Sequence, residues 1–385
     1  MRVPDLLDAA RGQTALDDFG DPSFREGLDV YVSSLTDEAD LSEVGELAVG
    51  AQIVGNLANR LQVVDWTNRH PELAAGVIER PVFVVGLPRT GTTFLSYLLD
   101  LDPSHRSLMR WEAQTSVPPP RRETFTSDPR IAATRDSQDM LDMINPEFKA
   151  IHYEAPDGPT ECLAVTAQEF KSVMWETVAN VPSYGAWLRQ VDYGSAYRYH
   201  KVVLQLLQSE APGRWMLKSP AHGFALESLL ETYPDARFVA THRDPTTIVA
   251  STCSLAACLS GTFSDVDHRE YIARRWTETV VDLLTRVEAL RASDPGVDAR
   301  FVDLRYVDLV ADPIASVRRV YEHIGSELSP STEAAVAAYA ADNRQGKYGR
   351  HSYSLGELGL DGADLRDRFA PYRERHDVPE ESVPA

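Results

Sequence analysis

The chain has 385 residues, of which 43% are hydrophobic and 25% are charged, and its formal net charge at pH 7 is −20. Such proportions are typical of a globular protein, and the length is enough for one large α/β domain or for two domains. The acidic balance argues against a protein whose main partner is nucleic acid or an anionic membrane, because both repel negative charge. It does not exclude a small anionic ligand, since a few cations can dominate the field inside a cleft.

Cysteine content and targeting signals favour a cytoplasmic protein. The three cysteines, Cys162, Cys253 and Cys258, include no C-x-x-C pair, so the sequence predicts neither a disulfide framework nor a zinc site. The first eight residues carry acidic side chains and no long apolar stretch, unlike a signal peptide. The densest apolar run, Thr246–Leu259, is interrupted by small and polar residues, and a bilayer-spanning helix needs roughly 18 apolar residues. We therefore expect no transmembrane segment.

Residues 1–80 are predicted to form a helical extension packed on the core. Leu57, Leu61 and Val64 recur at helical spacing, and His70-Pro71-Glu72 indicates a break followed by a new first turn. No cluster of chemically active side chains occurs in this part of the sequence. Residues 81–385 are expected to form the α/β domain that carries the function.

Four short apolar runs, each followed by a stretch with helical periodicity, predict a parallel α/β sheet. The runs are Pro81–Gly86, Arg214–Lys218, Ala236–Thr241 and Ala299–Leu304, and the helices that follow them are Thr92–Leu101, Phe224–Tyr233, Thr246–Leu259 and Pro313–Ile324. Strands that alternate with helices in this way form parallel sheets with right-handed crossovers. Ligands bind such sheets at the carboxyl ends of the strands, where most of the motifs below occur.

The segment Gly86-Leu-Pro-Arg-Thr-Gly-Thr-Thr93 lies between the first strand and its helix. Its spacing matches the Walker A phosphate loop, G-x-x-x-x-G-K-[ST], except that Thr92 occupies the lysine position. Gly91 allows backbone N–H groups to approach an anion, and the helix N-terminus adds its positive dipole end. Arg89 supplies a cation from another position. The loop predicts an anion cradle whose ligand is not a nucleoside triphosphate; a strand–helix turn without a ligand is the alternative.

Two further motifs follow the second and third strands. Lys218-Ser-Pro-Ala-His222 offers a lysine that can neutralise a bridging oxygen and a histidine that can take a proton from an attacking hydroxyl. A solvated lysine and a capping histidine are the alternatives. After the third strand, Arg243 and Ser251 lie eight residues apart, where a guanidinium and a hydroxyl can hold a second phosphate.

The sequence near the C-terminus gathers three cations and two glycines in Arg344–His351. It is either a solvated basic turn or a loop that closes over an anion. A kinase-like H-R-D at His242–Asp244 is a chance match, because D-F-G precedes it instead of following it.

Together these motifs resemble the PAPS-dependent sulfotransferase family, in particular a bacterial, actinobacterial-type branch with a helical N-terminal extension; PAPS is 3′-phosphoadenosine 5′-phosphosulfate. The resemblance runs from about Phe19 to Leu360. It implies a P-loop-like α/β fold and a transferase that moves a sulfuryl group from PAPS to a hydroxyl of a small-molecule, lipid or natural-product acceptor. The product is then adenosine 3′,5′-bisphosphate, and no metal is expected.

The family's functional residues map onto this chain by motif. The resemblance implies a donor site made of Arg89, Thr90, Gly91, Thr92 and Thr93 at the 5′-phosphosulfate, of Arg243 and Ser251 at the 3′-phosphate, and of Lys347, Gly349 and Arg350 in a closing loop near residues 343–360. Arg89 stands where the family usually has lysine, so the charge is kept but the donor geometry differs.

The resemblance assigns the catalytic roles to Lys218 and His222. Lys218 offsets charge on the leaving oxygen, Arg89 and the loop amides hold the sulfonate, and His222 deprotonates the acceptor. Three residues separate Lys218 from His222, where well-known cytosolic members have one. Glu161 is therefore an alternative base, and Glu112 is a candidate for shaping the pocket; capping carboxylates are the competing interpretation of both.

Other functions and the acceptor stay open at this point. A P-loop kinase or NTPase with a degenerate loop, and a non-catalytic nucleotide-binding protein, are the alternatives. The acceptor pocket is expected between residues 101 and 193 and after Cys258, where Trp111, Trp175 and Trp187 are candidate lining residues. Aromatic residues at such positions more often belong to the core.

Overall fold

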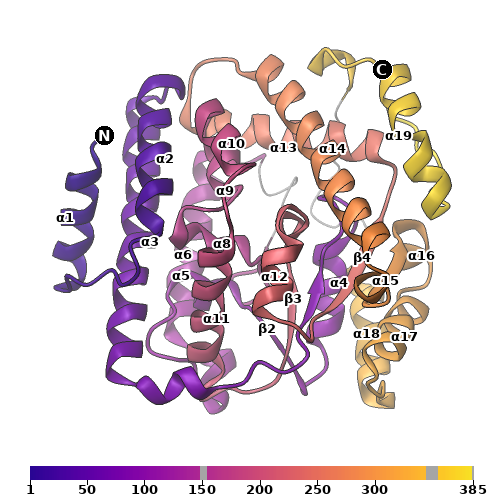
Figure 1. Cartoon of the computed structure of the whole chain (residues 1–385), viewed down its shortest axis with the longest axis horizontal. Coiled ribbons are helices and arrows are strands. Elements are labelled where there is room, and N and C mark those ends of the chain that lie inside the picture. Colours follow the sequence, from indigo (N-terminus) through magenta and orange to yellow (C-terminus); the bar gives the residue numbers. More distant parts are fainter. Residues whose placement is uncertain (148–153, 344–353, 384–385) are drawn as a thin grey trace.

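The structure is a computed structural model that describes residues 1–147, 154–343 and 354–383. Figure 1 shows a central sheet with helices packed around it, α1–α3 at one side of the molecule and α16–α18 at the opposite side. The strands are β1 (Val82–Val84), β2 (His105–Ser107), β3 (Arg214–Lys218), β4 (Arg237–His242) and β5 (Phe301–Arg305).

The helices of the described residues follow in chain order. The α-helices are α1 (Val3–Thr14), α2 (Phe24–Glu38), α3 (Glu43–Arg69), α4 (Thr92–Asp100), α5 (Arg110–Gln114), α6 (Pro129–Ile144), α8 (Leu163–Thr166), α9 (Met174–Val178), α10 (Pro182–Leu188), α11 (Gly194–Gln208), α12 (Leu226–Thr232), α13 (Pro245–Phe263), α14 (Arg269–Ser293), α15 (Pro295–Asp298), α16 (Tyr306–Ala311), α17 (Pro313–Ile324), α18 (Pro330–Asp342) and α19 (Gly362–His376). The 3-10 helices are η1 (Pro71–Ala75), η2 (Arg122–Ser127), η3 (Ala167–Glu169), η4 (Pro220–Phe224) and η5 (Gly356–Leu358).

All the described strands are parallel and lie in the order β2-β3-β1-β4-β5. The central strand β1 pairs with β3 through Val82 and Met216, and with β4 through Val82 and Arg237. Because the carboxyl ends of parallel strands share one edge, the segments after β1, β3 and β4 are neighbours there. The predicted parallel α/β sheet is thereby confirmed.

Successive residues of β1 face two different apolar layers. Val82 and Val84 pack in a cluster with Leu95 of α4 and Val320 of α17, whereas Phe83 belongs to the larger cluster on the other face. A strand points successive side chains to opposite faces, so a strand covered on both faces is apolar at every position. This double burial explains the continuous apolar run that predicts β1.

Strand β2 is not predicted by the sequence analysis, because its central residue is an arginine. Arg106 is 4% exposed, and its guanidinium donates to both carboxylate oxygens of Glu112 at 2.8 and 2.7 Å. A bidentate pair satisfies a buried charge without solvent. The strand is therefore buried without an apolar sequence, which a search for apolar runs cannot detect.

Arg60 of α3 fastens the helical N-terminal residues to the rest of the molecule. Its guanidinium donates to the carbonyl oxygens of Phe19 and Asp21, both at 2.8 Å, and forms a buried ion pair with Glu169. Apolar side chains of α1–α3 belong to the same buried cluster as Phe83 of the sheet. The helical character predicted for this part is present, and the domain boundary at residue 80 stays a prediction.

Helix α13 starts directly after β4 and runs through the interior. The Asp244 side chain accepts a hydrogen bond from the Thr246 amide at 3.0 Å, and Pro245 occupies the first turn, where no N–H is required. By length and composition α13 is apolar enough to cross a membrane, but 56% of its apolar window is buried, and it packs against α14, α9 and α3. An all-round apolar helix in such a position is a core helix.

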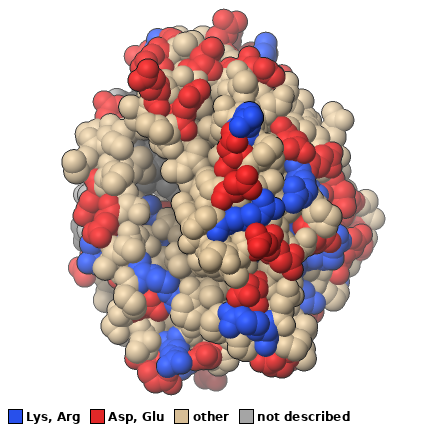
Figure 2. All heavy atoms as spheres, turned by 90° about the vertical axis from the view of Figure 1, so that its left-hand side faces the viewer, with Lys and Arg blue, Asp and Glu red and all other residues tan. Residues whose placement is uncertain are grey.

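The surface on the side of α1–α3 carries both signs of charge. Figure 2 shows Lys and Arg side chains interspersed with Asp and Glu on this face. Some are paired within a helix, such as Arg2 with Asp5 and Arg69 with Asp65, each at 2.7 Å. This face therefore presents no broad positive field of the kind that nucleic acid requires.

A stability test follows from the tight fit of Gly86 against β4. An added Cβ would collide with Oγ1 of Thr241 and lie 2.8 Å from its carbonyl oxygen. Gly86→Ala should therefore lower the free energy of unfolding by about 1–3 kcal/mol. Gly55, inside α3, has no atom within 4 Å of that position, so Gly55→Ala should raise it by roughly 0.5–1 kcal/mol. Urea denaturation of both variants measures this, and equal effects would contradict the described packing of the loop.

Candidate active site

The loop between β1 and α4 has a backbone held by its neighbours. The Thr90 hydroxyl donates to the Leu87 carbonyl oxygen at 2.6 Å and also pairs with the Thr241 hydroxyl of β4. Gly91, the N-cap of α4, has φ +84°, which glycine adopts without steric cost. Arg89 has φ +66°, which costs a non-glycine residue about 1–3 kcal/mol. Strain of this kind persists where contacts impose it, and it is typical of ligand-binding loops.

Arg89 joins the residues that were singled out as phosphate ligands. Its Nε donates to Oγ of Ser251 at 3.1 Å, and its carbonyl oxygen accepts from Nη1 of Arg243 at 2.9 Å. The Arg243 guanidinium also lies over the ring of Tyr306, 4.4 Å from the centroid. The structure thus brings Arg89, Arg243 and Ser251 together at the carboxyl edge of the sheet. Their roles as phosphate ligands stay predictions.

A cavity of about 740 Å³ adjoins this cluster. It is lined by the loop, α16 and the end of α18, through Arg89, Gly91, Thr92, Thr93, Phe94, Arg243, Tyr306, Val310, Pro313, Ala340, Ala341 and Asn343. Two guanidinium groups and the hydroxyls at the start of α4 suit phosphate oxygens, and the first turn of α4 adds backbone N–H groups. The donor set therefore fits an anionic nucleotide.

Lys218, at the end of β3, is buried among oxygen atoms. Its Nζ donates to Oγ1 of Thr93 at 3.1 Å and to carboxylate oxygens of Glu161 at 3.1 Å and Glu154 at 3.3 Å. Burial opposes the charged ammonium, but Glu161 and Glu154 outweigh it and raise the pKa of Lys218 above its ordinary value. Lys218 is therefore a stable cation that links the first turn of α4 to two carboxylates.

A second cavity, of about 230 Å³, shares Arg89 and Thr92 with the first. The rest of its lining is mostly apolar, with Pro88, Leu163, Val173, Met174, Thr177, Pro220, Ala221, Thr252, Leu255, Ala256, Leu259 and Trp276, and it includes Glu154, Thr160 and Glu161. An apolar cavity with a few convergent polar groups is typical of a substrate site. The carboxylates that hold Lys218 line this cavity, whereas Thr93, its other partner, lines the first.

His222 lies in η4 with its ring inside the core. It is 2% exposed, a 2.8 Å hydrogen bond joins its Nδ1 to the Tyr197 hydroxyl, and its ring meets Phe83 edge-on. Burial, and then the neighbouring His200, lower the pKa of His222 well below its ordinary value. His222 lines neither of the two cavities. Its role as the base stays a prediction, and these surroundings favour the alternative carboxylate Glu161.

Two of the tryptophans singled out as acceptor-pocket candidates lie in other surroundings. Trp175 stacks on Phe170 in the core with ring centroids 5.2 Å apart, and Trp187 donates to Glu26 at 3.0 Å. The tryptophan in the lining of the second cavity is Trp276 of α14. Both expected regions, residues 101–193 and the segment after Cys258, contribute to this lining, and Trp276 is its aromatic residue.

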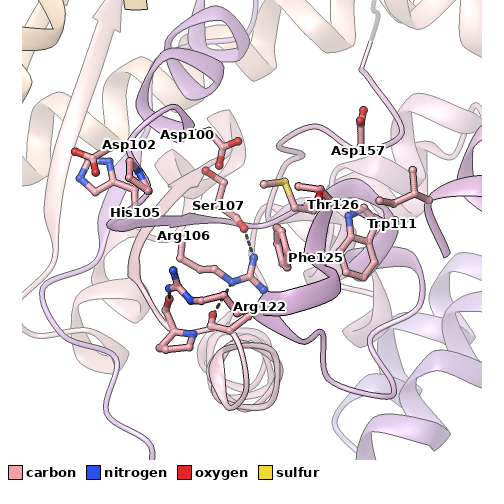
Figure 3. Close-up of a pocket in the computed structure, with 15 residues that line it drawn as sticks. Asp100, Asp102, His105, Arg106, Ser107, Trp111, Arg122, Phe125, Thr126 and Asp157 are labelled. Carbon is pink, nitrogen blue, oxygen red and sulfur yellow. Dashed lines mark hydrogen bonds between the residues drawn. The ribbon is translucent and has the colours of Figure 1, made fainter. Parts of the chain in front are cut away.

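Trp111, the third candidate, lines a further cavity of about 410 Å³ beside β2. Figure 3 shows this cavity, with Arg106 and Phe125 in its wall. Glu112, singled out as a pocket residue, is fully buried behind it as the partner of Arg106. Asp102 accepts a hydrogen bond from Tyr321 at 2.7 Å. The guanidinium of Arg106 in this wall is thus engaged by Glu112.

Three residues assigned to the closing loop, Lys347, Gly349 and Arg350, lie outside the described residues. Glu154, in contrast, is a residue of the site that sequence reasoning misses. It stands in no recognisable motif, although Pro156 and Gly158 form a turn between it and Glu161. A turn between two glutamates is the sequence feature that could have predicted that Glu154 and Glu161 lie close together.

One group of side chains has the ligand types of a metal site. His242, Asp303 and His376 place ligand atoms within 4.8 Å of one another. Arg291 already donates to both oxygens of Asp303 at 2.7 and 2.8 Å, and His242 Nε2 lies 2.7 Å from the same carboxylate. A positive guanidinium at the carboxylate disfavours a metal ion there, so these contacts are read as a structural network that docks α19.

Comparisons with known proteins agree with this geometry. A family model described as the sulfotransferase family matches residues 81–330. The crystal structure of sulfotransferase STF9 from Mycobacterium avium is similar with a TM-score of 0.91 and 34% identity, covering 99% of this chain and 98% of that one. Sulfotransferase STF1 from Mycobacterium tuberculosis gives a TM-score of 0.86 and 36% identity, covering 96% and 99%.

One curated relative is named for the compound that it sulfates. Omega-hydroxy-beta-dihydromenaquinone-9 sulfotransferase Stf3 from Mycobacterium tuberculosis is 27% identical over 293 residues, which are 72% of this chain and 71% of the relative.

The buried state of His222 generates a pH test. Its folded pKa lies well below the ordinary value of 6.5, so the unfolded state binds a proton that the folded state does not. Its contribution to stability is complete above pH 6.5 and is lost as the pH falls below it, by about 1.4 kcal/mol per pH unit. His222→Gln should remove this part of the slope. Urea denaturation between pH 7.5 and 5.5 measures it, and parallel curves for the two proteins would refute the buried, neutral state.

Proposed function

Because this chain belongs to the sulfotransferase family, we propose that it transfers a sulfuryl group from PAPS to the hydroxyl of an apolar acceptor. One observation carries the proposal: an anion-binding cavity and an apolar cavity share Arg89 and Thr92. Lys218 connects the two through Thr93 on one side and two carboxylates on the other. Family membership leaves the kinase and the non-catalytic alternatives without support.

The first cavity is the proposed donor site. The amides at the start of α4, with Arg89, Thr90, Gly91, Thr92 and Thr93, hold the 5′-phosphosulfate, since the loop has phosphate-binding geometry but lacks the Walker lysine. Arg243 and Ser251 hold the 3′-phosphate, because a guanidinium and a hydroxyl meet there within one hydrogen-bonded cluster. When bound, PAPS supplies the sulfuryl group and leaves as adenosine 3′,5′-bisphosphate. Lys347, Gly349 and Arg350 are proposed to close over it.

Lys218 and Glu161 carry the proposed chemistry. A new S–O bond forms to the acceptor oxygen while the bond from sulfur to the bridging oxygen of the donor breaks. Lys218 offsets the negative charge that develops on that bridging oxygen. Glu161 takes the proton of the acceptor hydroxyl and later releases it to water. The reaction therefore depends on positioning and electrostatics, as in phosphoryl transfer.

Glu161 is preferred over the other two candidate bases for geometric reasons. Oε1 of Glu161 pairs with Lys218, whereas Oε2 accepts no hydrogen bond from the described residues. In Glu154 both oxygens are engaged, Oε1 by Lys218 and Oε2 by the Thr160 hydroxyl at 2.9 Å. His222 is turned into the core. Glu161 thus offers the acceptor a carboxylate oxygen on the cavity wall.

The apolar lining of the second cavity supports an acceptor with a hydrocarbon or prenyl body and one reactive hydroxyl. Leu255 and Leu259 of α13 and Met174 of α9 supply aliphatic walls. The two carboxylates of the lining meet at Lys218. The substrate in the name of Stf3 is likewise a hydroxylated, menaquinone-derived lipid. A sugar would leave most of its hydroxyls unpaired against these walls.

Glu161→Gln tests the assignment of the base. The amide keeps the size of the side chain and can still accept from Lys218, but it cannot take a proton, so kcat should fall by about 10²- to 10⁴-fold. Binding of adenosine 3′,5′-bisphosphate, followed by calorimetry, should be unchanged. His222→Gln is the matched variant and should keep kcat within about threefold. The opposite pattern, an active Glu161→Gln and an inactive His222→Gln, would assign the base to His222.

A series of primary alcohols tests the acceptor class. With labelled PAPS, kcat/KM should rise about fourfold for each added methylene until the cavity is filled, because each buried CH₂ contributes about 0.8 kcal/mol. Leu255→Gln should flatten this dependence without changing donor affinity. Glycerol and glucose are the polar controls. Equal turnover of glucose and decanol would rule out an apolar acceptor site while leaving the donor site intact.

A further inference from the structure

Arg243 makes its principal ion pair with a residue far away in the sequence. The carboxylate of Glu381 accepts from Nε and Nη2 of Arg243, both at 2.7 Å. The Glu381 amide donates to Oδ2 of Asp244 at 2.9 Å, and Asp244 caps α13. The segment after α19 therefore lies across the carboxyl end of β4, with its carboxylate on the arginine that lines the donor cavity.

This segment is held in place by contacts other than Glu381. The Val378 amide donates to the Arg373 carbonyl oxygen at 2.9 Å, and Val378 is 8% exposed. The helix before it is docked through Tyr372, whose hydroxyl lies 2.6 Å from Nδ1 of His242. Glu381 is thus presented to Arg243 by an ordered support, at a high effective concentration.

The pairing has the geometry of an oxyanion bound by an arginine fork. Two parallel N–H···O bonds to a carboxylate are the same arrangement that a phosphate adopts on a guanidinium. The Nη1 of Arg243 donates elsewhere, to the Arg89 carbonyl oxygen. A phosphate that takes the Nε–Nη2 edge of Arg243 must therefore displace Glu381.

We propose that Glu381 is an intramolecular competitor for the 3′-phosphate of the donor, so that it sets the apparent affinity for 3′-phosphorylated nucleotides. This inference rests on the proposed function, in which Arg243 binds the 3′-phosphate. Each such nucleotide must first displace Glu381, and its dissociation constant is raised by the inverse of the fraction of molecules with Arg243 released. A nucleotide without a 3′-phosphate does not meet this competition.

The ion pair between Arg243 and Glu381 also favours release of the product. Adenosine 3′,5′-bisphosphate keeps the 3′-phosphate after transfer, so it competes with Glu381 as the donor does. Return of the carboxylate to Arg243 opposes rebinding of the product at that end.

Calorimetric titration of the full-length protein distinguishes a competitor from a structural contact. Glu381→Gln keeps the side-chain size but removes the charge, and should bind adenosine 3′,5′-bisphosphate about 3- to 10-fold more tightly than the wild type. Its affinity for adenosine 5′-monophosphate should not change. Glu380→Gln is the matched control, because Glu380 pairs with Arg373 instead, and it should match the wild type for both nucleotides.

The other outcomes overturn the inference in distinguishable ways. Unchanged binding of the bisphosphate by Glu381→Gln means that Glu381 does not compete with it. Weaker binding means that Glu381 orients Arg243 for the ligand. In both cases the competitor role fails while the donor site stands. Arg243→Ala tests the premise separately, since it should weaken binding of the bisphosphate much more than binding of the monophosphate. If Arg243→Ala affects both equally, or if no variant binds the bisphosphate, the proposed donor site fails and the competitor role fails with it.

Discussion

The buried ammonium of Lys218 is the constraint around which the site is organised. Taking a charge out of water costs several kcal/mol unless partners replace the solvent. Thr93 from the start of α4 and the carboxylates of Glu154 and Glu161 supply that replacement. The interaction therefore fixes the distance between the phosphate loop and the segment that carries the acidic residues. The two cavities meet where these segments come together, at Arg89 and Thr92.

Much of the fold is predictable from sequence because four of the described strands follow short, largely apolar runs. Strand β1 is buried at every position, and β3 and β4 are buried at every position but the first. The helix Pro313–Ile324 even has the predicted bounds, since Pro313 marks its first turn and Gly325, with φ +65°, ends it. Strand β2 escapes prediction because its burial is achieved by the Arg106–Glu112 ion pair and not by apolar residues. Pairing of this kind leaves no periodic pattern in the sequence.

In the candidate site, too, some features can be predicted from the sequence and others cannot. Local spacing within one loop or helix singles out Arg89, Arg243 and Ser251 as candidates. The structure adds that these three lie together. The direction of a side chain after a strand has no such signal in the sequence. Helix η4 turns His222 into the core. The buried ammonium of Lys218 instead contacts Thr93 and Glu161, which line the two cavities. Contacts across long separations, such as Arg243 with Glu381, depend on the whole fold and have no sequence signature.

The walls of the two cavities come from different parts of the architecture. The side proposed for the donor is built on the sheet edge and the first turn of α4, where an added Cβ on Gly86 would collide with Thr241 of β4. The apolar side is built from the faces of α9, α13 and α14, through residues such as Met174, Leu255 and Trp276. Substitutions in those helices can change the shape of the apolar cavity, whereas packing against β4 restricts substitutions in the loop. Under the proposed function, duplicated copies of such a gene could therefore diverge in the alcohol that they sulfate while they keep the same sulfuryl donor.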